Sequence, residues 1–208
     1  MPASTGRPVF VHINKTAGSS IVRSAGEHIV NAGHRLAADW IRENGRPGSL
    51  FSVVRHPYER VRSEYTYRRR RWEGGEQNPH LANLRLPFDQ WVHQTYVLDA
   101  FRTRGFFERT GVEFNEFQMA DDVLVWFLPQ AHWLCDDNGN LLVDEVLRFE
   151  HLAEEWPAFC ARYGFDAPLV HVNASPVFPL VKGRFTAEVR AIIADYFADD
   201  FERFGYEP

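Results

Sequence analysis

The sequence predicts an α/β fold, in which an open, mainly parallel sheet of four or five strands is flanked by helices. Two short apolar runs, Val9 to Ile13 and Leu50 to Val54, are rich in β-branched residues, and each leads directly into a segment with helical spacing. Strands that alternate with helices in this way form a parallel sheet. The chain has 208 residues, 45% of them hydrophobic, so we expect one domain over residues 1–208 with a substantial core.

Apolar spacing and turn residues predict the remaining elements in chain order. Helices are expected over 20–30, before Asn31-Ala32-Gly33, then over 36–44, 57–71, 88–102 with Gly105 closing it, 150–163, and from an N-cap at Thr186 to 206. A further strand is expected within residues 141–149, and residues 72–86 are interpreted as a loop.

Composition excludes several classes of protein. The formal net charge of −5 argues against a general nucleic-acid binder, which normally has a basic excess. No apolar run is long enough to span a bilayer, and the first predicted strand begins within the first ten residues, so we expect a soluble, cytoplasmic protein. Cys135 and Cys160 are expected to be packing residues in a reducing compartment rather than a disulfide framework.

The first predicted strand turns tightly into a helix, and this junction has the features of an anion-binding loop. Backbone N–H groups at a helix start lack partners and the helix dipole adds partial positive charge, while Lys15 contributes a full charge. The loop does not match G-x-x-x-x-G-K-[ST], because Lys15 precedes Gly18. Taken alone, it also suits an ordinary turn with a solvated lysine. The candidate binding residues are Lys15, Thr16, Ala17, Gly18, Ser19 and Ser20.

A second candidate anion site follows the second predicted strand. Arg55 stands directly after Val54, and Pro57 suits the first turn of a new helix that includes Ser63. In open α/β sheets, ligands bind outside the carboxyl ends of the strands. We therefore expect Arg55 and the Lys15 loop to converge.

These two segments, residues 10–20 and 53–65, resemble the two cofactor motifs of the sulfotransferase superfamily, in the branch that contains carbohydrate sulfotransferases. The first is similar to that branch's P-K-T-G/A-G-T/S-S loop, and the second to its R-x-P-x-x-R-x-x-S segment. Segments 128–134, 148–150, 171–173 and 196–206 resemble its C-terminal pattern, so the likeness covers most of the chain. The chain departs from the pattern at Asn14, where proline is usual, and at His56, where Asp or Asn is common.

The resemblance implies a P-loop-like α/β fold and a defined donor, 3′-phosphoadenosine 5′-phosphosulfate (PAPS). The 15–20 loop would hold the 5′-phosphosulfate, with Lys15 near the bridging oxygen, while Arg55 and Ser63 would hold the 3′-phosphate. The expected reaction is in-line transfer of the sulfuryl group to a hydroxyl of a carbohydrate or other small acceptor, with no metal required. The sequence does not identify the acceptor or the oligomeric state.

Transfer to a hydroxyl also needs a base, and histidine is the usual choice. Among the nine histidines, His34 lies in the connection after the first helix, where the resemblance implies a functional histidine. His132 is the second candidate, and Glu27 and Glu64 are alternatives. The histidines interpreted as structural are His12, His56 and His171.

The sequence is also compatible with two other functions, and it contains two basic segments that need an interpretation. A small-molecule kinase would use the same loop with a nucleoside triphosphate, and a non-catalytic binder of nucleotides or sulfated glycans would lack the base. The run Arg68-Arg69-Arg70-Arg71 is interpreted as a solvated last helical turn rather than a polyanion site. Lys182-Gly183-Arg184 is interpreted as a solvated loop rather than a cover for the 3′-phosphate.

Overall fold

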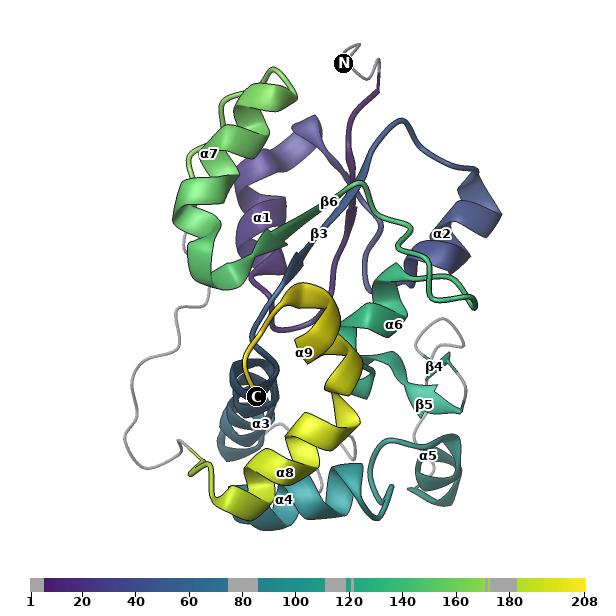
Figure 1. The fold of residues 1–208 in the computed structure, drawn as a ribbon, viewed down its shortest axis with the longest axis vertical. Helices are drawn as coiled ribbons and strands as arrows, with labels where there is room; N and C mark the ends of the chain where they lie inside the picture. Colours follow the sequence, from purple (N-terminus) through teal and green to yellow (C-terminus); the bar gives the residue numbers. More distant parts are fainter. Residues whose placement is uncertain (1–5, 75–85, 111–118, 121, 171, 173–182) are drawn as a thin grey trace. The chain divides into compact units, whose positions relative to one another are not determined.

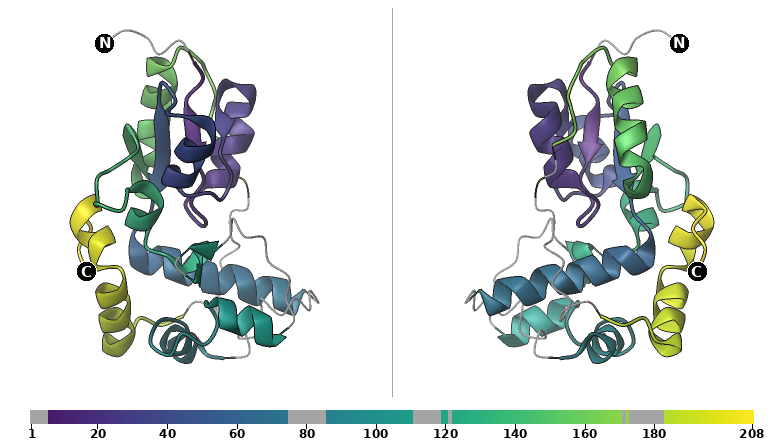
Figure 2. Two further views of the ribbon diagram at one scale, coloured as in Figure 1. Left: turned by 90° about the vertical axis from the view of Figure 1, so that its right-hand side faces the viewer. Right: turned by 90° about the vertical axis from the view of Figure 1, so that its left-hand side faces the viewer.

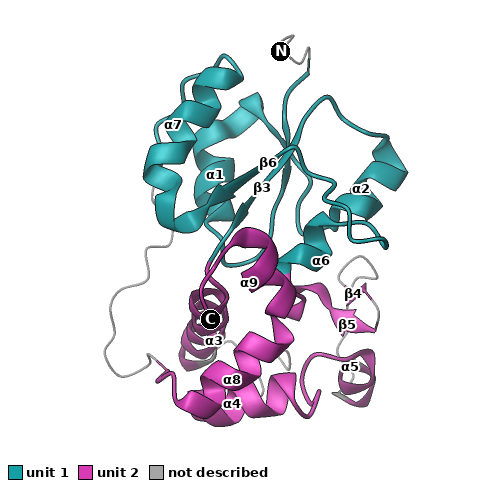
Figure 3. Cartoon of the chain, viewed as in Figure 1, with its two compact units in different colours: residues 1–55, 130–175 teal, residues 56–129, 176–208 magenta. Residues whose placement is uncertain are grey.

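The computed structural model describes residues 6–74, 86–110, 119–120, 122–170, 172 and 183–208. The chain forms two compact units, each built from two separate stretches (Figure 3). Unit 1 comprises residues 1–55 and 130–175, and unit 2 comprises residues 56–129 and 176–208. The chain therefore leaves unit 1 after Arg55 and re-enters it at Gln130.

Unit 1 is built around a parallel sheet. Its strands are β1 (Val9–Val11), β2 (Val30–Asn31), β3 (Leu50–Val54) and β6 (Glu145–Arg148). They follow the spatial order β2-β1-β3-β6, and each neighbouring pair is parallel. In the register of this sheet, Val11 pairs with Ser52 and Val54 pairs with Arg148. The predicted α/β fold with a parallel sheet is confirmed.

Helices cover both faces of the sheet (Figure 1): α1 (Gly18–Ala25), α2 (Ala37–Asn44), α6 (Gln130–Leu134) and α7 (Leu152–Arg162). Helices α1 and α7 share one hydrophobic cluster with Phe10, Phe51 and Val53 of the strands. The side views show opposite faces of the sheet, with α2 in front in one and α7 in front in the other (Figure 2). Burial on both faces explains why β3 is apolar except at Ser52, whose hydroxyl donates to the Val11 carbonyl at 2.8 Å.

The second strand of the sheet differs from the sequence prediction. A helix was predicted over residues 20–30, but α1 ends at Ala25, and Val30 and Asn31 form β2. Gly26 follows α1 with a φ of 53°, and its N–H donates to the Val22 carbonyl, which closes the helix. A two-residue strand carries no periodic signal of its own, so only its pairing with β1 identifies it.

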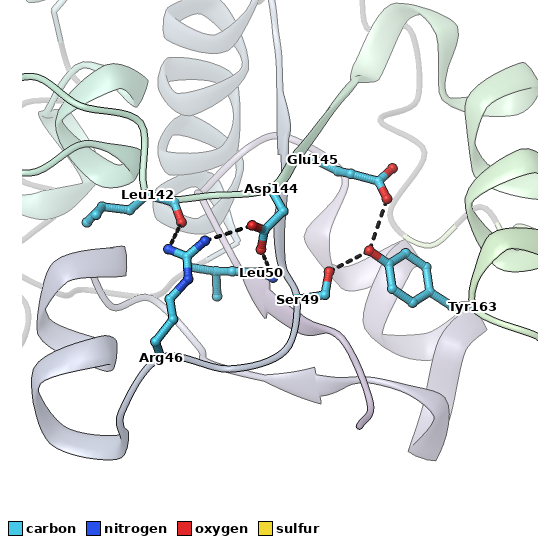
Figure 4. A network of polar contacts seen from close by, with 7 residues as sticks. All are labelled: Arg46, Ser49, Leu50, Leu142, Asp144, Glu145 and Tyr163. Carbon is cyan, nitrogen blue, oxygen red and sulfur yellow. Dashed lines mark hydrogen bonds and ion pairs between the residues drawn. The ribbon is translucent and has the colours of Figure 1, made fainter. Parts of the chain in front are cut away.

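A polar network fixes the amino ends of β3 and β6 (Figure 4). The Asp144 carboxylate accepts hydrogen bonds from the Leu50 N–H and from Arg46, each at 2.7 Å, and Arg46 also donates to the Leu142 carbonyl. The Tyr163 hydroxyl donates to Glu145 at 3.0 Å. This network lies at the end of the sheet opposite to the loops that follow β1 and β3, so it sets strand register without entering the candidate site.

Unit 2 is mainly helical, with a small antiparallel strand pair. Its helices are α3 (Pro57–Glu73), α4 (Phe88–Tyr96), α5 (Arg104–Thr110), α8 (Ala187–Tyr196) and α9 (Ala198–Phe204), and the pair is β4 (Met119–Ala120) with β5 (Val123–Leu124). The predicted start of α3 at Pro57 is confirmed. Thr186 caps α8 as predicted, since its hydroxyl oxygen accepts from the Val189 N–H at 3.2 Å.

The predicted bounds of two helices in unit 2 are wrong. The helix expected over 88–102 ends at Tyr96, and Gly105 lies inside α5 rather than closing it. The C-terminal helix is interrupted at Phe197, which separates α8 from α9. Most of the predicted 72–86 loop lies outside the described residues.

The interpretation of the arginine run as solvated is wrong for Arg68. Its side chain is only 4% exposed, and its Nε donates to the buried Glu64 carboxylate at 2.7 Å. The guanidinium also lies 4.6 Å from the centroid of the Phe127 ring. Arg68 is therefore a core residue of unit 2, whereas Arg70 and Arg71 occupy the exposed last turn as predicted.

In the described part of the chain, no helix combines the length and the apolar character needed to cross a bilayer.

Candidate anion-binding site

Three predicted site residues follow three adjacent strands of unit 1. His34 comes after β2, Lys15 after β1 and Arg55 after β3, and these strands are neighbours in the order β2-β1-β3. The chain moves from β1 to β2 on one side and then to β3 on the other, so β1 and β3 flank the point where the strand order reverses. This is the position at which open parallel sheets bind ligands.

The backbone of the β1–α1 loop is strained. Lys15 and Ala17 have left-handed φ values of 66° and 72°, whereas Asn14 and Thr16 do not. A left-handed backbone costs a non-glycine residue about 1–2 kcal/mol, so the surrounding structure must hold both residues in place. Alternation between the two hands turns successive N–H groups toward one side, which is the geometry of an anion-binding concavity.

Several backbone N–H groups of this loop are not used by the hydrogen bonds of α1. Among the described residues, no hydrogen bond of good geometry is donated by the backbone N–H of Thr16, Ala17, Gly18 or Ser19. The first hydrogen bonds of α1 run from the Ser20 and Ile21 N–H groups to the Ala17 carbonyl, at 2.8 and 3.1 Å. The start of α1 therefore presents consecutive donors and the positive end of its dipole.

The side chains of the loop divide into structural and accessible groups. The Thr16 hydroxyl is buried and donates to the Ile13 carbonyl at 2.9 Å. The buried Ser20 hydroxyl oxygen accepts from the Val172 N–H at 3.1 Å. Ser19 is exposed. Of the hydroxyls predicted to bind the anion, that of Ser19 is thus the most accessible, and Thr16 shapes the loop.

Gly18 brings the start of α1 into contact with the His12 ring. A Cβ atom at residue 18 would lie 1.8 Å from Cδ2 of His12, far inside van der Waals contact. The His12 ring is itself held by stacking on Phe10, with ring centroids 5.4 Å apart. Only glycine allows this approach of helix and strand end.

Replacing Gly18 with alanine is therefore expected to lower the free energy of unfolding by about 1–3 kcal/mol, the usual cost of overpacking. Gly6→Ala is the matched control, because a Cβ at residue 6 would have no atom within 4 Å. Urea unfolding of both variants measures the difference, and equal stability would contradict the close contact.

Arg55 connects the two predicted motifs. Its Nη1 donates to the Lys15 carbonyl at 3.2 Å, and its guanidinium lies 4.0 Å from the centroid of the Phe149 ring. The predicted convergence of Arg55 with the Lys15 loop is confirmed. The carbonyl contact helps to hold Lys15 in its left-handed conformation, and Phe149 supports the guanidinium from one side.

Sequence reasoning missed the role of Gln130, which is fully buried at the start of α6. Its Oε1 accepts from the Arg55 N–H and its Nε2 donates to the Arg55 carbonyl, both at 2.8 Å. The side-chain amide thus pairs with the Arg55 backbone as a neighbouring strand would. Pro129-Gln130 stood out in the sequence only within the family resemblance.

The hydrogen bond that His34 makes defines which of its ring nitrogens carries the proton. Its Nδ1 lies 2.7 Å from the His12 carbonyl oxygen, which can only accept, so Nδ1 carries the hydrogen. In the neutral ring the basic lone pair is then on Nε2. Trp133 of α6 meets the His34 ring edge-on at a centroid distance of 6.3 Å. The half-buried ring is therefore oriented on two sides.

His12 is held neutral, in line with its interpretation as a structural residue. Burial, and secondly the neighbouring His34, lower the pKa of His12 from its usual value to about 3. The two rings lie 4.3 Å apart between centroids. A neutral His12 leaves the positive charge of the loop to Lys15 and the helix start.

This pKa shift predicts acid sensitivity. Between about pH 6.5 and pH 3, His12 is protonated in the unfolded state but stays neutral in the folded state. The free energy of unfolding is therefore unaffected by His12 above pH 6.5 and falls as the pH is lowered toward 3. The slope is at most about 1.4 kcal/mol per pH unit. Urea unfolding between pH 7 and pH 4 is expected to show a steeper decline in wild type than in His12→Phe. The exposed His151→Gln variant should follow wild type, and parallel wild-type and His12→Phe profiles would contradict the shift.

The other predicted residues belong to further helices and loops of the chain. His132 is an exposed residue of α6 in unit 1. Ser63 is a half-buried residue of α3 in unit 2, and its predicted role stays a prediction. Glu64 is engaged by Arg68, while Glu27 is exposed.

His171 and Lys182 lie outside the described residues. Within the described ranges, no group of three or more histidine, cysteine, aspartate or glutamate side chains could hold a metal ion.

Comparison of the chain with protein-family models, with curated proteins and with solved structures gives no match in any of the three.

Proposed function

We propose that the protein is a sulfotransferase that moves a sulfuryl group from PAPS to an acceptor hydroxyl. The observation that carries this proposal is the hydrogen bond from Arg55 to the Lys15 carbonyl, which joins two cationic motifs at the carboxyl edge of one parallel sheet. A ligand with two anionic groups needs two such motifs close together. A single phosphate would need only the loop.

The residues present suit both ends of this donor. Consecutive N–H groups at the start of α1, with Lys15 and the exposed Ser19, provide donors and positive charge for the 5′-phosphosulfate. The planar guanidinium of Arg55 can bind a phosphate through two parallel hydrogen bonds. Because the net charge of the whole chain is −5, the positive charge that attracts an anion must come from local residues such as these. The donor, when bound, would supply the activated sulfuryl group.

The chain's own residues would then do three things. Nε2 of His34 accepts the proton of the acceptor hydroxyl as the oxygen–sulfur bond forms. Lys15 and the N–H groups of α1 stabilise the negative charge that develops on the phosphate oxygen as its bond to sulfur breaks. Arg55 holds the far end of the donor and thereby fixes the line of attack.

Ligand preference tests the proposal against a nucleotide kinase. Calorimetric titration of the full chain with adenosine 3′,5′-bisphosphate, ADP and ATP should show the tightest binding for the 3′-phosphorylated ligand, without added magnesium. Equal affinity for the three ligands, or a magnesium-dependent preference for ATP, would overturn the sulfotransferase assignment.

Transfer itself is tested with donor labelled in the sulfuryl group. A panel of monosaccharides, oligosaccharides and phenols, each incubated with the protein and labelled PAPS, is expected to yield a labelled product with at least one class of hydroxyl. Binding of the bisphosphate together with no transfer to any class would favour the non-catalytic binder.

A further inference from the structure

We infer that Gln130 is the positioning residue that sets the direction of the Arg55 guanidinium, and through it the affinity for the 3′-phosphate. This inference rests on the proposed function, because it concerns the ligand of the same site. It assigns a role to a buried amide that does not itself point at the ligand but pairs with the backbone of the residue that does.

The pairing occurs where the sheet stops supporting β3. The register of β3 with β6 ends at Val54 opposite Arg148, so the peptide of Arg55 is the first beyond the ladder. Gln130 replaces the missing strand there, with Oε1 accepting from the Arg55 N–H and Nε2 donating to its carbonyl. Both groups of the Arg55 backbone are thereby fixed, although the chain leaves unit 1 after this residue.

Fixing the backbone of Arg55 also fixes its side chain. The guanidinium makes two contacts that depend on where the Cα lies, the hydrogen bond to the Lys15 carbonyl at 3.2 Å and the 4.0 Å contact with the Phe149 ring. Rotation of the Arg55 peptide would move the guanidinium away from both. A phosphate bound through two parallel hydrogen bonds tolerates little misdirection of the donor plane.

Only a primary amide of this length can make both bonds. Methionine has a similar size but neither accepts nor donates comparably, and a carboxylate accepts from the N–H but cannot donate to the carbonyl. Gln130 is 0% exposed and packs at the start of a helix whose Trp133 touches the His34 ring. One short helix, α6, thus contacts both the proposed phosphate-binding residue and the proposed base.

The test measures how much affinity the 3′-phosphate adds. Calorimetry gives Kd for adenosine 3′,5′-bisphosphate and for adenosine 5′-monophosphate, and the monophosphate Kd divided by the bisphosphate Kd isolates the contribution of the 3′-phosphate. Gln130→Met is expected to weaken bisphosphate binding by about 5- to 20-fold while changing monophosphate binding less than about 2-fold, the effect of misdirecting one charge-assisted contact. Gln90→Met, at an exposed position of α4, is the matched control and should behave as wild type.

A double-mutant cycle separates positioning from general damage. Once Arg55 is replaced by alanine, Gln130→Met should have no further effect on the ratio, because the residue it positions is gone. Gln130→Glu serves if the methionine variant folds poorly, and it is expected to reduce the ratio as well. Amide hydrogen exchange at Arg55 should accelerate in Gln130→Met, because methionine offers no comparable acceptor for the Arg55 N–H.

The possible failures are distinct. A wild-type protein that binds both nucleotides equally would overturn the proposed function itself. A wild-type protein that prefers the bisphosphate, with a folded Gln130→Met variant that keeps the full preference, would overturn only the role of Gln130. An equal loss for both nucleotides, or an additive effect with Arg55→Ala, would show that Gln130 merely stabilises the fold.

Discussion

Replacing His34 with glutamine is expected to lower kcat for sulfuryl transfer by about 10²- to 10⁴-fold, the usual contribution of a positioned general base. The glutamine amide can still donate to the His12 carbonyl, which His34 Nδ1 contacts at 2.7 Å, so the loss should reflect the missing basic nitrogen. The KM for the donor should stay nearly constant, because His34 holds neither of its anionic ends. Steady-state kinetics with labelled donor measures both parameters.

His132 provides the decisive comparison. It is exposed on α6 and was the second candidate for the base. If His132→Gln loses activity by the larger factor while His34→Gln retains it, the assignment of the base to His34 is wrong. His151→Gln, an exposed histidine after β6, controls for the loss of a histidine as such.

Arg55→Ala is expected to weaken binding of adenosine 3′,5′-bisphosphate by about 10- to 150-fold, which corresponds to the loss of hydrogen bonds to a charged group. Binding of adenosine 5′-monophosphate should change much less, although removal of the bond to the Lys15 carbonyl will loosen the loop to some extent. Arg55→Lys should recover only part of the affinity, since an ammonium cannot make two parallel bonds.

Arg70→Ala controls for the loss of one positive charge. Arg70 is exposed in the last turn of α3, so its removal should leave the affinity for both nucleotides unchanged within a factor of two or so. Calorimetry at constant ionic strength measures all three variants. Bisphosphate binding by Arg55→Ala at the wild-type affinity would remove Arg55 from the site.

The sequence predicted the parts of the site that depend on local pattern. The apolar run at 50–54 predicted β3 with its observed ends, and Pro57 predicted the start of α3. The position of Arg55 directly after a parallel strand predicted that it would lie near Lys15. These predictions held because strand ends and helix starts have strong local signals.

The features that the sequence did not predict depend on distant partners. Gln130 contacts Arg55 across 75 positions of the chain, and nothing local marks that pair. Arg68 became a core residue because Glu64 neutralises it and Phe127 covers it, whereas Arg70 and Arg71 of the same run are exposed. Strand β2 is only two residues long, so it can be recognised only by its pairing with β1.

The sequence pattern also did not predict the backbone strain in the β1–α1 loop. Left-handed conformations are expected at glycine, yet here Lys15 and Ala17 adopt them while Gly18 does not. Two contacts account for part of this, since Arg55 bonds to the Lys15 carbonyl and the His12 ring occupies the space beside Gly18. Strain of this kind concentrates where a backbone is shaped for binding.

A ligand that engages both the loop and Arg55 should be visible in amide NMR spectra of the isotope-labelled protein. Adenosine 5′-monophosphate should shift the amide signals of residues 16–19 and leave the Arg55 side-chain signal unchanged. Adenosine 3′,5′-bisphosphate should shift both sets with one common Kd. A bisphosphate that shifts the loop signals alone, or shifts the two sets with different Kd values, would contradict the two-ended site.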